Sequence, residues 1–554
     1  MKTDCDLLVI GSGAAGLCAA VTGAAKGLRV IVAEKATVYG GTTAWAGGWI
    51  WAPGNPAAQR LGIAEPLDAP RQYLKTLLGS AFDAERVEAF LTFAPRAIEF
   101  LETEAGLSFE CGSLIPDTYS EVEGAGQGGR SVIAAPYNAR DLGPLLHDLR
   151  PPLRETSFWG LPIQAGSDLR AFMSMTRSPK AFLYVASRMA RHLWDLAFHR
   201  RAMQLRNGNA LMARLLRAAT DLGVNLRKSH TATKLLQHDG RVSGAIFATL
   251  QGEVTITAGN VVLAAGGLAR DASLAAPHSL AVPEATGDSA RIARAVGARI
   301  DCKLAARFAQ CPVSIVPYPN AASAVFPHII ERGKPGIIGV LANGQRFCNE
   351  GLGYHDYVVA LNKSSSEENP VSWLICDHRF QRRYGLGIAR PAPLPLGKLL
   401  RSGYLVRSHS LSNLAAICGI DPQGLLATVA SYNHDAVSGK DSSFGRGETA
   451  YARLQGDPNH TGPNPCMAPI AKAPFYAVKI VAGSFGAFIG LKTDAAARVL
   501  DAEDKPIAGL YAAGTDMASV FGGFYPAGGI NIGPALTFGH IAALHAAGCL
   551  EEPR

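Results

Sequence analysis

The fold is decided by residues 6–21, which read DLLVIGSGAAGLCAAV. An apolar run leads into a glycine-punctuated turn, and small helix-forming residues follow it. In a nucleotide-binding βαβ unit, Gly11 would permit the tight turn, Gly13 would let the backbone approach a pyrophosphate, and Gly16 would let helix and strand pack closely. The spacing therefore predicts a strand, a phosphate-binding turn and a helix.

A second strand and an acid complete this unit. Residues 28–33, LRVIVA, read as the strand, and Glu34 follows it, 18 residues after the last glycine of the turn. A carboxylate at this distance is placed to accept the ribose hydroxyls, and Lys35 lies beside it. The phosphates would lie on the free N–H groups of Ala14 and Ala15, where the helix dipole favours negative charge. This order predicts a dinucleotide site rather than a plain βαβ unit.

A second glycine cluster indicates which dinucleotide binds. Where a nicotinamide enzyme would proceed to its third strand, this chain returns to glycines and hydroxyl side chains. A backbone that stays beside the cofactor suits a longer ligand, and we therefore predict FAD. The cofactor-binding residues expected here are Gly40, Gly41, Thr42, Thr43, Gly47 and Gly48.

The composition agrees with a cofactor enzyme of two or three domains. The 554 residues are 48% hydrophobic and 18% charged, which is enough to bury a large core. The net charge of +8 (53 basic minus 45 acidic residues) is mild and can attract anionic ligands or a membrane surface. The chain lacks a dense basic run, so we do not expect nucleic acid as a partner.

The ten cysteines and the N-terminus indicate a cytoplasmic protein. No cysteine pair has C-x-x-C spacing, so we expect no metal site and reduced thiols. The N-terminus enters a strand within a few residues, which leaves no room for a signal peptide. No apolar run of ~18 residues occurs, so we expect no transmembrane helix.

Residues 150–206 alternate arginines with aromatic residues. A basic amphipathic helix of this kind can lie on a membrane, as a peripheral contact, or on another subunit. The alternative is a solvated face on which the arginine stems cover apolar surface, and we favour this interpretation. The aromatic residues include Phe158, Trp159, Phe172, Phe182, Tyr184, Trp194 and Phe198.

Later segments return to the nucleotide-binding fold. A buried strand at 261–267 ends in glycines, and a helix over 289–296 follows. A last strand at 509–514 precedes the glycine-rich stretch 522–534, which opens the C-terminal helix. The cofactor contacts predicted in these segments are Gly266, Gly267, Asp288, Gly514, Ile530 and Ile532.

Three local predictions concern elements outside that fold pattern. Asp83 is expected to cap a helix that Pro95 breaks or restarts. Residues 335–349 read as a β-hairpin around an Asn-Gly turn. The pair Asp421-Pro422 is expected to start a helix that runs through Val429.

The order of these segments predicts an α/β fold in which one domain interrupts another. The nucleotide-fold motifs stop near residue 301, and they return after residue 475. We expect a discontinuous Rossmann-like FAD-binding domain, residues 1–301 with a helical excursion near 150–206, completed by residues 476–554. An inserted α+β substrate domain would occupy residues 302–475, with its inner face closing over the flavin.

Motifs along nearly the whole chain carry a family resemblance. They are Gly40-Gly41-Thr42-Thr43, residues 344–350, Pro463-Asn464-Pro465, residues 474–477, residues 510–514, Tyr525-Pro526-Ala527-Gly528-Gly529 and residues 532–535. Their order resembles the fumarate reductase/succinate dehydrogenase-type flavoproteins. Within these it is most similar to the 3-ketosteroid Δ1-dehydrogenases and their cyclic-ketone relatives.

The resemblance implies α,β-dehydrogenation of a cyclic or steroidal ketone, with the α-proton going to a tyrosine and hydride to flavin N5. Tyr354 matches the proton-abstracting tyrosine, and Tyr357 is its rival. Tyr525 and the Gly529 N–H match the pair that binds the carbonyl oxygen. Tyr119 matches a supporting tyrosine, although Thr118 stands where the family has an aromatic residue.

The resemblance also implies a non-covalent flavin, because no histidine lies in residues 40–48, where covalent members attach theirs. The electron acceptor is unknown. A fumarate-reductase-like enzyme acting on an unsaturated acid or enone is the alternative, and it would need an arginine proton donor, for which Arg307, Arg332 and Arg346 are available. A flavin-binding partner protein without turnover is a third interpretation.

Overall fold

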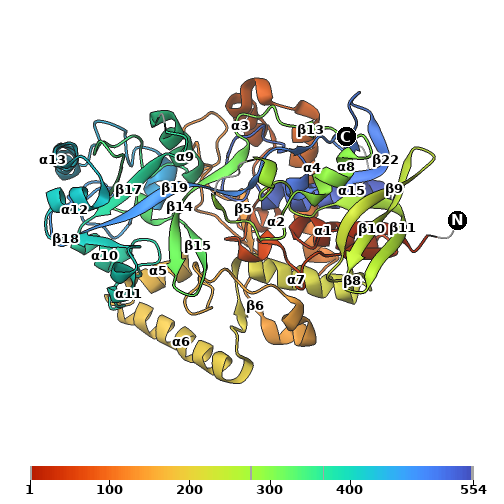
Figure 1. Ribbon diagram of the computed structural model, residues 1–554, viewed down its shortest axis with the longest axis horizontal. Helices are drawn as coiled ribbons and strands as arrows, with labels where there is room; N and C mark the ends of the chain where they lie inside the picture. The colour runs from red at the N-terminus through yellow and green to blue at the C-terminus, as the bar shows by residue number, and fades with distance from the viewer. Residues whose placement is uncertain (1–2, 275–277, 366, 551–554) are drawn as a thin grey trace.

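The computed structural model describes residues 3–274, 278–365 and 367–550. Its eight-stranded sheet is built around the N-terminal βαβ unit (Figure 1). β1 (Cys5–Ile10) lies between β2 (Val30–Ala33) and β11 (Gly252–Leu263), and all three are parallel. β8 (Asn225–Arg227) and β22 (Pro506–Ala512) extend the parallel order on the two sides. The strand–turn–helix–strand reading of the N-terminus is confirmed.

Antiparallel strands extend this sheet further. β9 (Thr231–His238) and β10 (Arg241–Thr249) form a hairpin that pairs with β11, and β21 (Arg498–Leu500) pairs with β22. The C-terminal strand β22 thus completes a sheet that the first residues begin. The predicted α/β fold with a discontinuous FAD-binding part is confirmed by this topology.

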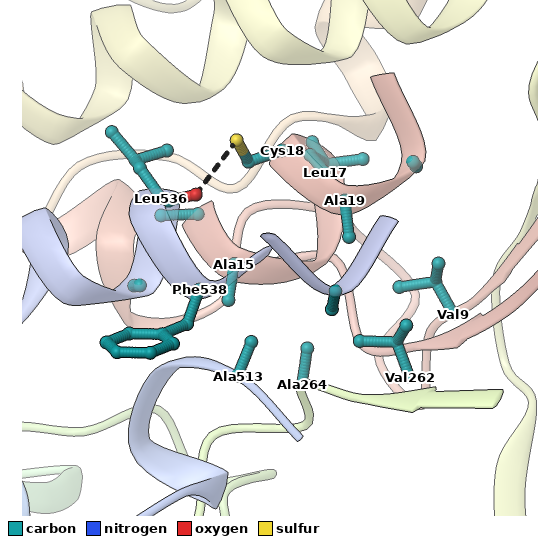
Figure 2. Packing of buried hydrophobic residues seen from close by; sticks show 14 of the residues in the cluster. Val9, Ala15, Leu17, Cys18, Ala19, Val262, Ala264, Ala513, Leu536 and Phe538 are labelled. Atoms are coloured by element: carbon teal, nitrogen blue, oxygen red, sulfur yellow. Dashed lines mark hydrogen bonds between the residues drawn. The ribbon is translucent and has the colours of Figure 1, made fainter. Parts of the chain in front are cut away.

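Two helices made of small residues cover the centre of the sheet. α1 (Ala14–Ala25) packs against α15 (Ile532–Ala546), and Figure 2 shows the Cys18 thiol donating to the Leu536 carbonyl oxygen at 3.2 Å. A Cβ at Gly539 would lie 2.5 Å from the Ala15 carbonyl oxygen, so the close approach of the helices requires glycine there. This packing ties the C-terminal helix to the turn that begins α1.

A second, seven-stranded sheet lies beside the first (Figure 1). Its central strand, β19 (Phe475–Ala487), pairs antiparallel with β14 (Phe308–Tyr318) and β17 (Val371–Cys376). The remaining strands are β12 (His278–Ser279), β15 (Ala321–Pro327), β16 (Ile337–Val340) and β18 (Val406–Ser408). β19 begins at residue 475, so this sheet extends into the segment after the predicted domain boundary. The limits of the three-part domain division remain a proposal.

The predictions for the helices at Asp83 and at Asp421-Pro422 are correct at the helix start and wrong about where each helix breaks or ends. Asp83 accepts from the Arg86 N–H as predicted, but α4 (Ala84–Thr103) continues through Pro95, because its apolar face is buried on both sides of the proline. α13 (Pro422–Ser438) starts at the predicted cap and extends well beyond Val429.

The predicted hairpin at 335–349 has only one strand. β16 pairs with β17, and beyond the turn a single bridge joins Val340 to Arg346. The Arg346 guanidinium is held in ion pairs with Glu350 and Asp441, both at 2.8 Å, which turns this segment away from strand pairing.

The segment 150–206 carries α5 (Ser167–Ser174) and α6 (Pro179–His199), and Figure 1 shows α6 at the periphery. Several apolar side chains of α6 are more than half exposed, so this face is solvated as the favoured interpretation expects, but arginine stems leave these side chains largely uncovered. They are Phe182, Leu183, Leu193, Trp194 and Phe198. Across the described ranges, no helix combines the length and apolar character needed to cross a bilayer.

Candidate active site

The three glycines of the first turn have two different environments. A Cβ at Gly11, whose φ is +107°, would lie 2.2 Å from the Ala264 carbonyl oxygen, and one at Gly16 would lie 2.0 Å from the Gly11 carbonyl oxygen. A Cβ at Gly13 would meet only the Thr43 hydroxyl, at 3.9 Å. The protein's own packing therefore requires Gly11 and Gly16, whereas Gly13 faces space that a pyrophosphate can occupy.

The second glycine cluster lies against this turn. The Ala14 N–H donates to Thr43 Oγ1 at 3.3 Å, and a Cβ at Gly41 would lie 3.5 Å from the Gly13 Cα. The N-cap of α1 is Gly13, which has no side chain to accept from the first turn, so the Ala15 N–H is available to an anion. Thr42 Oγ1 accepts from the Val282 N–H at 3.2 Å.

The other glycines of this cluster differ in what they do. A Cβ at Gly48 would lie 2.5 Å from the backbone of Asn207, so Gly48 serves helix packing. A Cβ at Gly40 would lie 3.1 Å from the Ala44 Cβ, while one at Gly47 would meet no described atom within 4 Å. Gly47 is therefore better placed than Gly48 for a ligand contact.

Glu34 is buried and already orders the phosphate turn. Its Oε2 accepts from the N–H and the hydroxyl of Ser12, at 2.9 and 2.5 Å, and its Oε1 accepts from the Ala36 N–H at 2.8 Å. A carboxylate oxygen can accept more than one hydrogen bond, so Oε1 retains capacity for a ribose hydroxyl. The predicted ribose contact is compatible with this geometry.

Lys35 and Asp288 are brought together from distant segments. The Lys35 Nζ donates to Asp288 Oδ2 and to Thr286 Oγ1, both at 2.7 Å. Burial acts to raise the pKa of Asp288, but the ion pairs with Lys35 and Arg291 lower it below its usual value. A charged pair therefore stands beside the second strand of the unit.

The predicted Gly266–Gly267 turn is held by an acid, Asp516, that was not predicted. Asp516 Oδ1 accepts from the Gly267 N–H at 2.9 Å, and Oδ2 accepts from the Ala265 N–H. Burial raises the pKa of Asp516 to about 6. In the sequence, Asp516 could have been found from its position just after the predicted Gly514, at the end of β22. Asp516 thus holds the predicted Gly266–Gly267 turn in place.

Gly514 and Ile530 both line a small cavity of about 20 Å³. Phe488 and Asn531 also line it, and Ile532 follows as the first residue of α15. The C-terminal motif and the end of β22 therefore lie close together, and the cofactor contacts predicted for Gly514, Ile530 and Ile532 stay predictions.

Two of the predicted tyrosines touch. The Tyr354 hydroxyl donates to the Tyr525 hydroxyl at 2.9 Å, and their rings meet edge to face with centroids 5.0 Å apart. Tyr354 is the first residue of α9 (Tyr354–Ser364), and Tyr525 lies in the loop before α15. Burial raises the pKa of both phenols, and the Tyr525 oxygen raises that of Tyr354 further. Both are therefore neutral at ordinary pH.

Tyr357, the rival base, lies elsewhere. Its hydroxyl shares a hydrogen bond with Ser372 Oγ at 3.0 Å, and its ring belongs to the core of the second sheet. The structure thus places Tyr354, and not Tyr357, against Tyr525.

The loop that carries Tyr119 is tied to the Tyr525 loop. The Pro526 carbonyl oxygen accepts from the Thr118 N–H at 2.9 Å and from the Tyr73 hydroxyl at 2.7 Å. The Tyr119 hydroxyl itself donates to Asp356 Oδ1 at 2.7 Å. Asp356 was not predicted, and its signal was only its place in the first turn after Tyr354.

Gly529 has a backbone that only glycine adopts readily. Its φ is +107°, and a Cβ would lie 2.6 Å from the Trp51 nitrogen. Its carbonyl oxygen accepts from the N–H groups of Trp51 and Gly533, whereas its own N–H donates to no acceptor in the described part of the chain. This N–H and the Tyr525 hydroxyl are the two donors that the sequence predicted for a carbonyl oxygen.

Two of the three candidate arginines are engaged. Arg332 donates to the carbonyl oxygens of His328, Glu350 and Leu352, and is buried. Arg346 is held by its two acidic partners. Arg307 stacks on the Phe308 ring. Among the described residues, no group of three or more His, Cys, Asp or Glu side chains is placed to hold a metal ion.

Comparisons with known proteins agree with this geometry. The family described as "FAD binding domain" matches residues 6–532. A 4-oxocyclohex-2-ene-1-carboxylate 5-dehydrogenase of Sinomonas cyclohexanicum is 38% identical over 97% of this chain and 93% of its own length. A 3-oxosteroid 1-dehydrogenase of Mycobacterium tuberculosis is 33% identical, with 98% of both chains covered.

A solved structure is similar over its whole length. It is the 3-ketosteroid Δ1-dehydrogenase of Sterolibacterium denitrificans in complex with 1,4-androstadiene-3,17-dione, with a TM-score of 0.90, 33% identity, and coverage of 98% of this chain and 99% of that one. The predicted cofactor, FAD, and the class of enzyme, an oxidoreductase acting on CH–CH groups, are confirmed by these relatives. The chain belongs to the FAD binding domain family and, within the fumarate reductase/succinate dehydrogenase flavoproteins, to the 3-ketosteroid Δ1-dehydrogenase-like branch.

Proposed function

We propose that the protein removes two hydrogens from adjacent carbons of a cyclic ketone and releases the conjugated enone. The observation that carries this proposal is the contact between Tyr354 and Tyr525, four residues before Gly529, whose N–H donates to no acceptor among the described residues. Two hydroxyls and an N–H fit a ketone and its enolate. They offer no cation for a carboxylate.

The protein residues would divide the work as follows. The Tyr525 hydroxyl and the Gly529 N–H bind the carbonyl oxygen and stabilise the charge that develops there, at about 2–4 kcal/mol per donor. Tyr354 takes the α-proton as its phenolate, after its own hydroxyl proton has passed to solvent, and the carbonyl donors lower the cost of the transfer by stabilising the enolate. FAD, when bound, accepts the hydride from the next carbon. Glu34, Lys35 and the glycine turns would hold it without a covalent bond.

The reductase alternative is less well supported. A fumarate-type enzyme needs a free arginine as proton donor, and Arg332 and Arg346 are committed to backbone carbonyls and carboxylates. Arg307 has neither of these commitments, so a direct measurement must decide.

Anaerobic mixing with a substrate panel tests the proposal. The oxidised protein is mixed with a 3-ketosteroid, with 4-oxocyclohexanecarboxylate and with simple cyclohexanones, and loss of the flavin absorbance is followed. We expect at least one ketone to bleach the flavin, and the rates to separate steroid from small-ring substrates. The proposal fails if no ketone bleaches it while the reduced protein is reoxidised rapidly by fumarate-like acids. Flavin that stays on the polypeptide after acid precipitation would contradict non-covalent binding.

The α6 helix supports a peripheral membrane contact. Its exposed aromatic and leucine side chains share the surface with exposed basic residues of the same segment: Arg170, Arg177, Lys180, Arg191 and Arg200. The acids of α5 and α6, Asp168 and Asp195, are buried and paired with Arg188 and Arg140. A positive surface with protruding aromatic rings suits an anionic lipid interface.

Vesicle sedimentation tests this contact. We expect the protein to pellet with vesicles that contain anionic lipid and to remain in solution with neutral ones. Trp194→Glu combined with Phe198→Glu should abolish pelleting and leave flavin reduction unchanged. Equal pelleting of the variant would contradict the assignment to α6.

A further inference from the structure

Asp356 lies beside the tyrosines, and its carboxylate has no role in the proposed chemistry. It is the third residue of α9, two residues after Tyr354, and it is largely buried. Its Oδ1 accepts from the Tyr119 hydroxyl at 2.7 Å, a distance typical of a hydrogen bond to a charged acceptor.

The groups around Asp356 come from three other elements and one loop. The Arg332 guanidinium, from η5 (Glu331–Gly333), favours its charged form, as does the hydroxyl of Tyr119 from the preceding loop. The phenols of Tyr73, in α3 (Asp68–Leu78), and Tyr451, in α14 (Ala450–Gln455), also feel its charge. Burial outweighs the favourable partners and raises the pKa of Asp356 above its usual value.

Tyr451 links this group to the reacting pair. Its backbone N–H donates to Ser120 Oγ at 3.2 Å, next to Tyr119, and its helix packs on the segment that leads to Tyr354, where a Cβ at Gly351 would lie 3.5 Å from the Ala452 Cβ. Its phenol acts on the pKa of both Tyr119 and Tyr354. Tyr354 and Asp356 share the first turn of α9, and the Thr118 N–H donates to the Pro526 carbonyl oxygen, so the Tyr119–Asp356 pair and the Tyr354–Tyr525 pair lie on directly connected segments.

We propose that Asp356 is a positioning residue for the dehydrogenation and that it acts through Tyr119. An ionised Asp356 accepts a hydrogen bond from the Tyr119 hydroxyl. The Tyr119 oxygen can then act toward the other phenols only as an acceptor. A protonated Asp356 can donate instead, so that Tyr119 can turn its own proton toward the cluster. The inference rests on the proposed function, since it assigns a state to the tyrosines of that same site.

Asp356 also has a structural task that the test must separate from this one. A Cβ at Gly353 would lie 2.5 Å from Asp356 Oδ2, which places the carboxylate over the start of α9, where a negative charge stabilises a helix. Asp356→Ala would confound the two roles. Asp356→Asn keeps the shape and an acceptor oxygen, and removes only the charge and its titration.

Stopped-flow flavin reduction with a saturating ketone, followed across acid and neutral pH, tests the inference. In the wild type, the rate should fall as the pH drops through the raised pKa of Asp356. Asp356→Asn should lose this acid limb and slow the neutral rate by about 10- to 100-fold, with FAD content and Tm retained. Glu121→Gln, an exposed carboxylate change in the Tyr119 loop, is the matched control and should leave the profile unchanged.

A double variant shows whether the effect passes through Tyr119. Tyr119→Phe should slow reduction by a similar factor and also remove the acid limb, and adding Asp356→Asn to it should cost no further rate. The inference is overturned if Asp356→Asn keeps the wild-type acid limb, or if it slows Tyr119→Phe as much as it slows the wild type. If the wild type is bleached by no ketone, the proposed function fails and this inference fails with it. If only the variants behave unexpectedly, the inference alone falls.

Discussion

The nucleotide-binding unit and the tyrosine cluster are built in opposite ways. The first is local: its glycines, helix and acid lie within residues 6–48 and contact one another. The second is assembled from afar, because Tyr354 and Tyr525 are 171 positions apart and Tyr119 and Asp356 are 237 positions apart. Backbone packing determines the first, while the second depends on how two sheets meet. A substitution in the first should therefore remove folded or cofactor-bound protein, and one in the second should remove activity alone.

The largest effect is expected at Gly16. In Gly16→Ala the new Cβ would lie 2.0 Å from the Gly11 carbonyl oxygen, and two backbone segments must separate. We expect a loss of about 3 kcal/mol or more in the free energy of unfolding and little soluble holoprotein. Thermal unfolding and the yield of FAD-bound protein measure it.

Gly13→Ala is the matched control, because its Cβ meets no close protein atom. It should fold with a Tm near that of the wild-type apoprotein but bind FAD at least about tenfold more weakly, or about 1.4 kcal/mol. Equal losses of stability in both variants would erase the distinction between the packing glycine and the ligand glycine.

The next effect is expected at Tyr354. Tyr354→Phe keeps the ring against Phe485 and Tyr525 but removes the proposed base. We expect flavin reduction by a ketone to slow by about 10²–10⁴-fold, with FAD content unchanged. Tyr357→Phe, whose hydroxyl meets only Ser372, is the control and should retain most of the rate. A wild-type rate in Tyr354→Phe would exclude it as the base.

A smaller loss is expected at Tyr525. Tyr525→Phe removes one of two carbonyl donors and leaves the Gly529 N–H, so we expect a decrease of about 10²–10³-fold in the reduction rate. Because the same hydroxyl also accepts from Tyr354, the double variant with Tyr354→Phe should be less than additive. Strictly additive losses, measured by single-turnover flavin reduction, would place the two hydroxyls in independent roles.

The same contrast explains how far the sequence could be read. Gly11, Gly16 and Glu34 could be predicted from spacing alone, because the glycine turn and the acid after the second strand form one local pattern, although Gly11 also packs against the distant Ala264. Tyr354 and Tyr525 were reached only through family motifs, and Asp356 not at all, since no local pattern tells which carboxylate Tyr119 will meet. Contacts beyond the local pattern explain the failed break at Pro95 and the missing hairpin strand at 345–349: the apolar face of α4 is buried on both sides of the proline, and Arg346 pairs with the distant Asp441 as well as with Glu350.

The smallest effect is expected at Glu34, whose carboxylate both orders the glycine turn and is proposed to bind the ribose. Glu34→Ala removes a proposed ribose acceptor. It also leaves the buried N–H groups of Ser12 and Ala36 without their acceptor. The second loss alone should cost about 1–3 kcal/mol of stability. Ser12→Ala separates the two losses, because it disturbs the same turn, through its contacts to Glu34 and the Gly40 N–H, without touching the ribose acceptor. FAD dissociation constants should rise more in Glu34→Ala than in Ser12→Ala at equal loss of apoprotein Tm. If the two variants lose FAD affinity only in proportion to stability, Glu34 acts by shaping the turn and the ribose contact is not needed to explain its position.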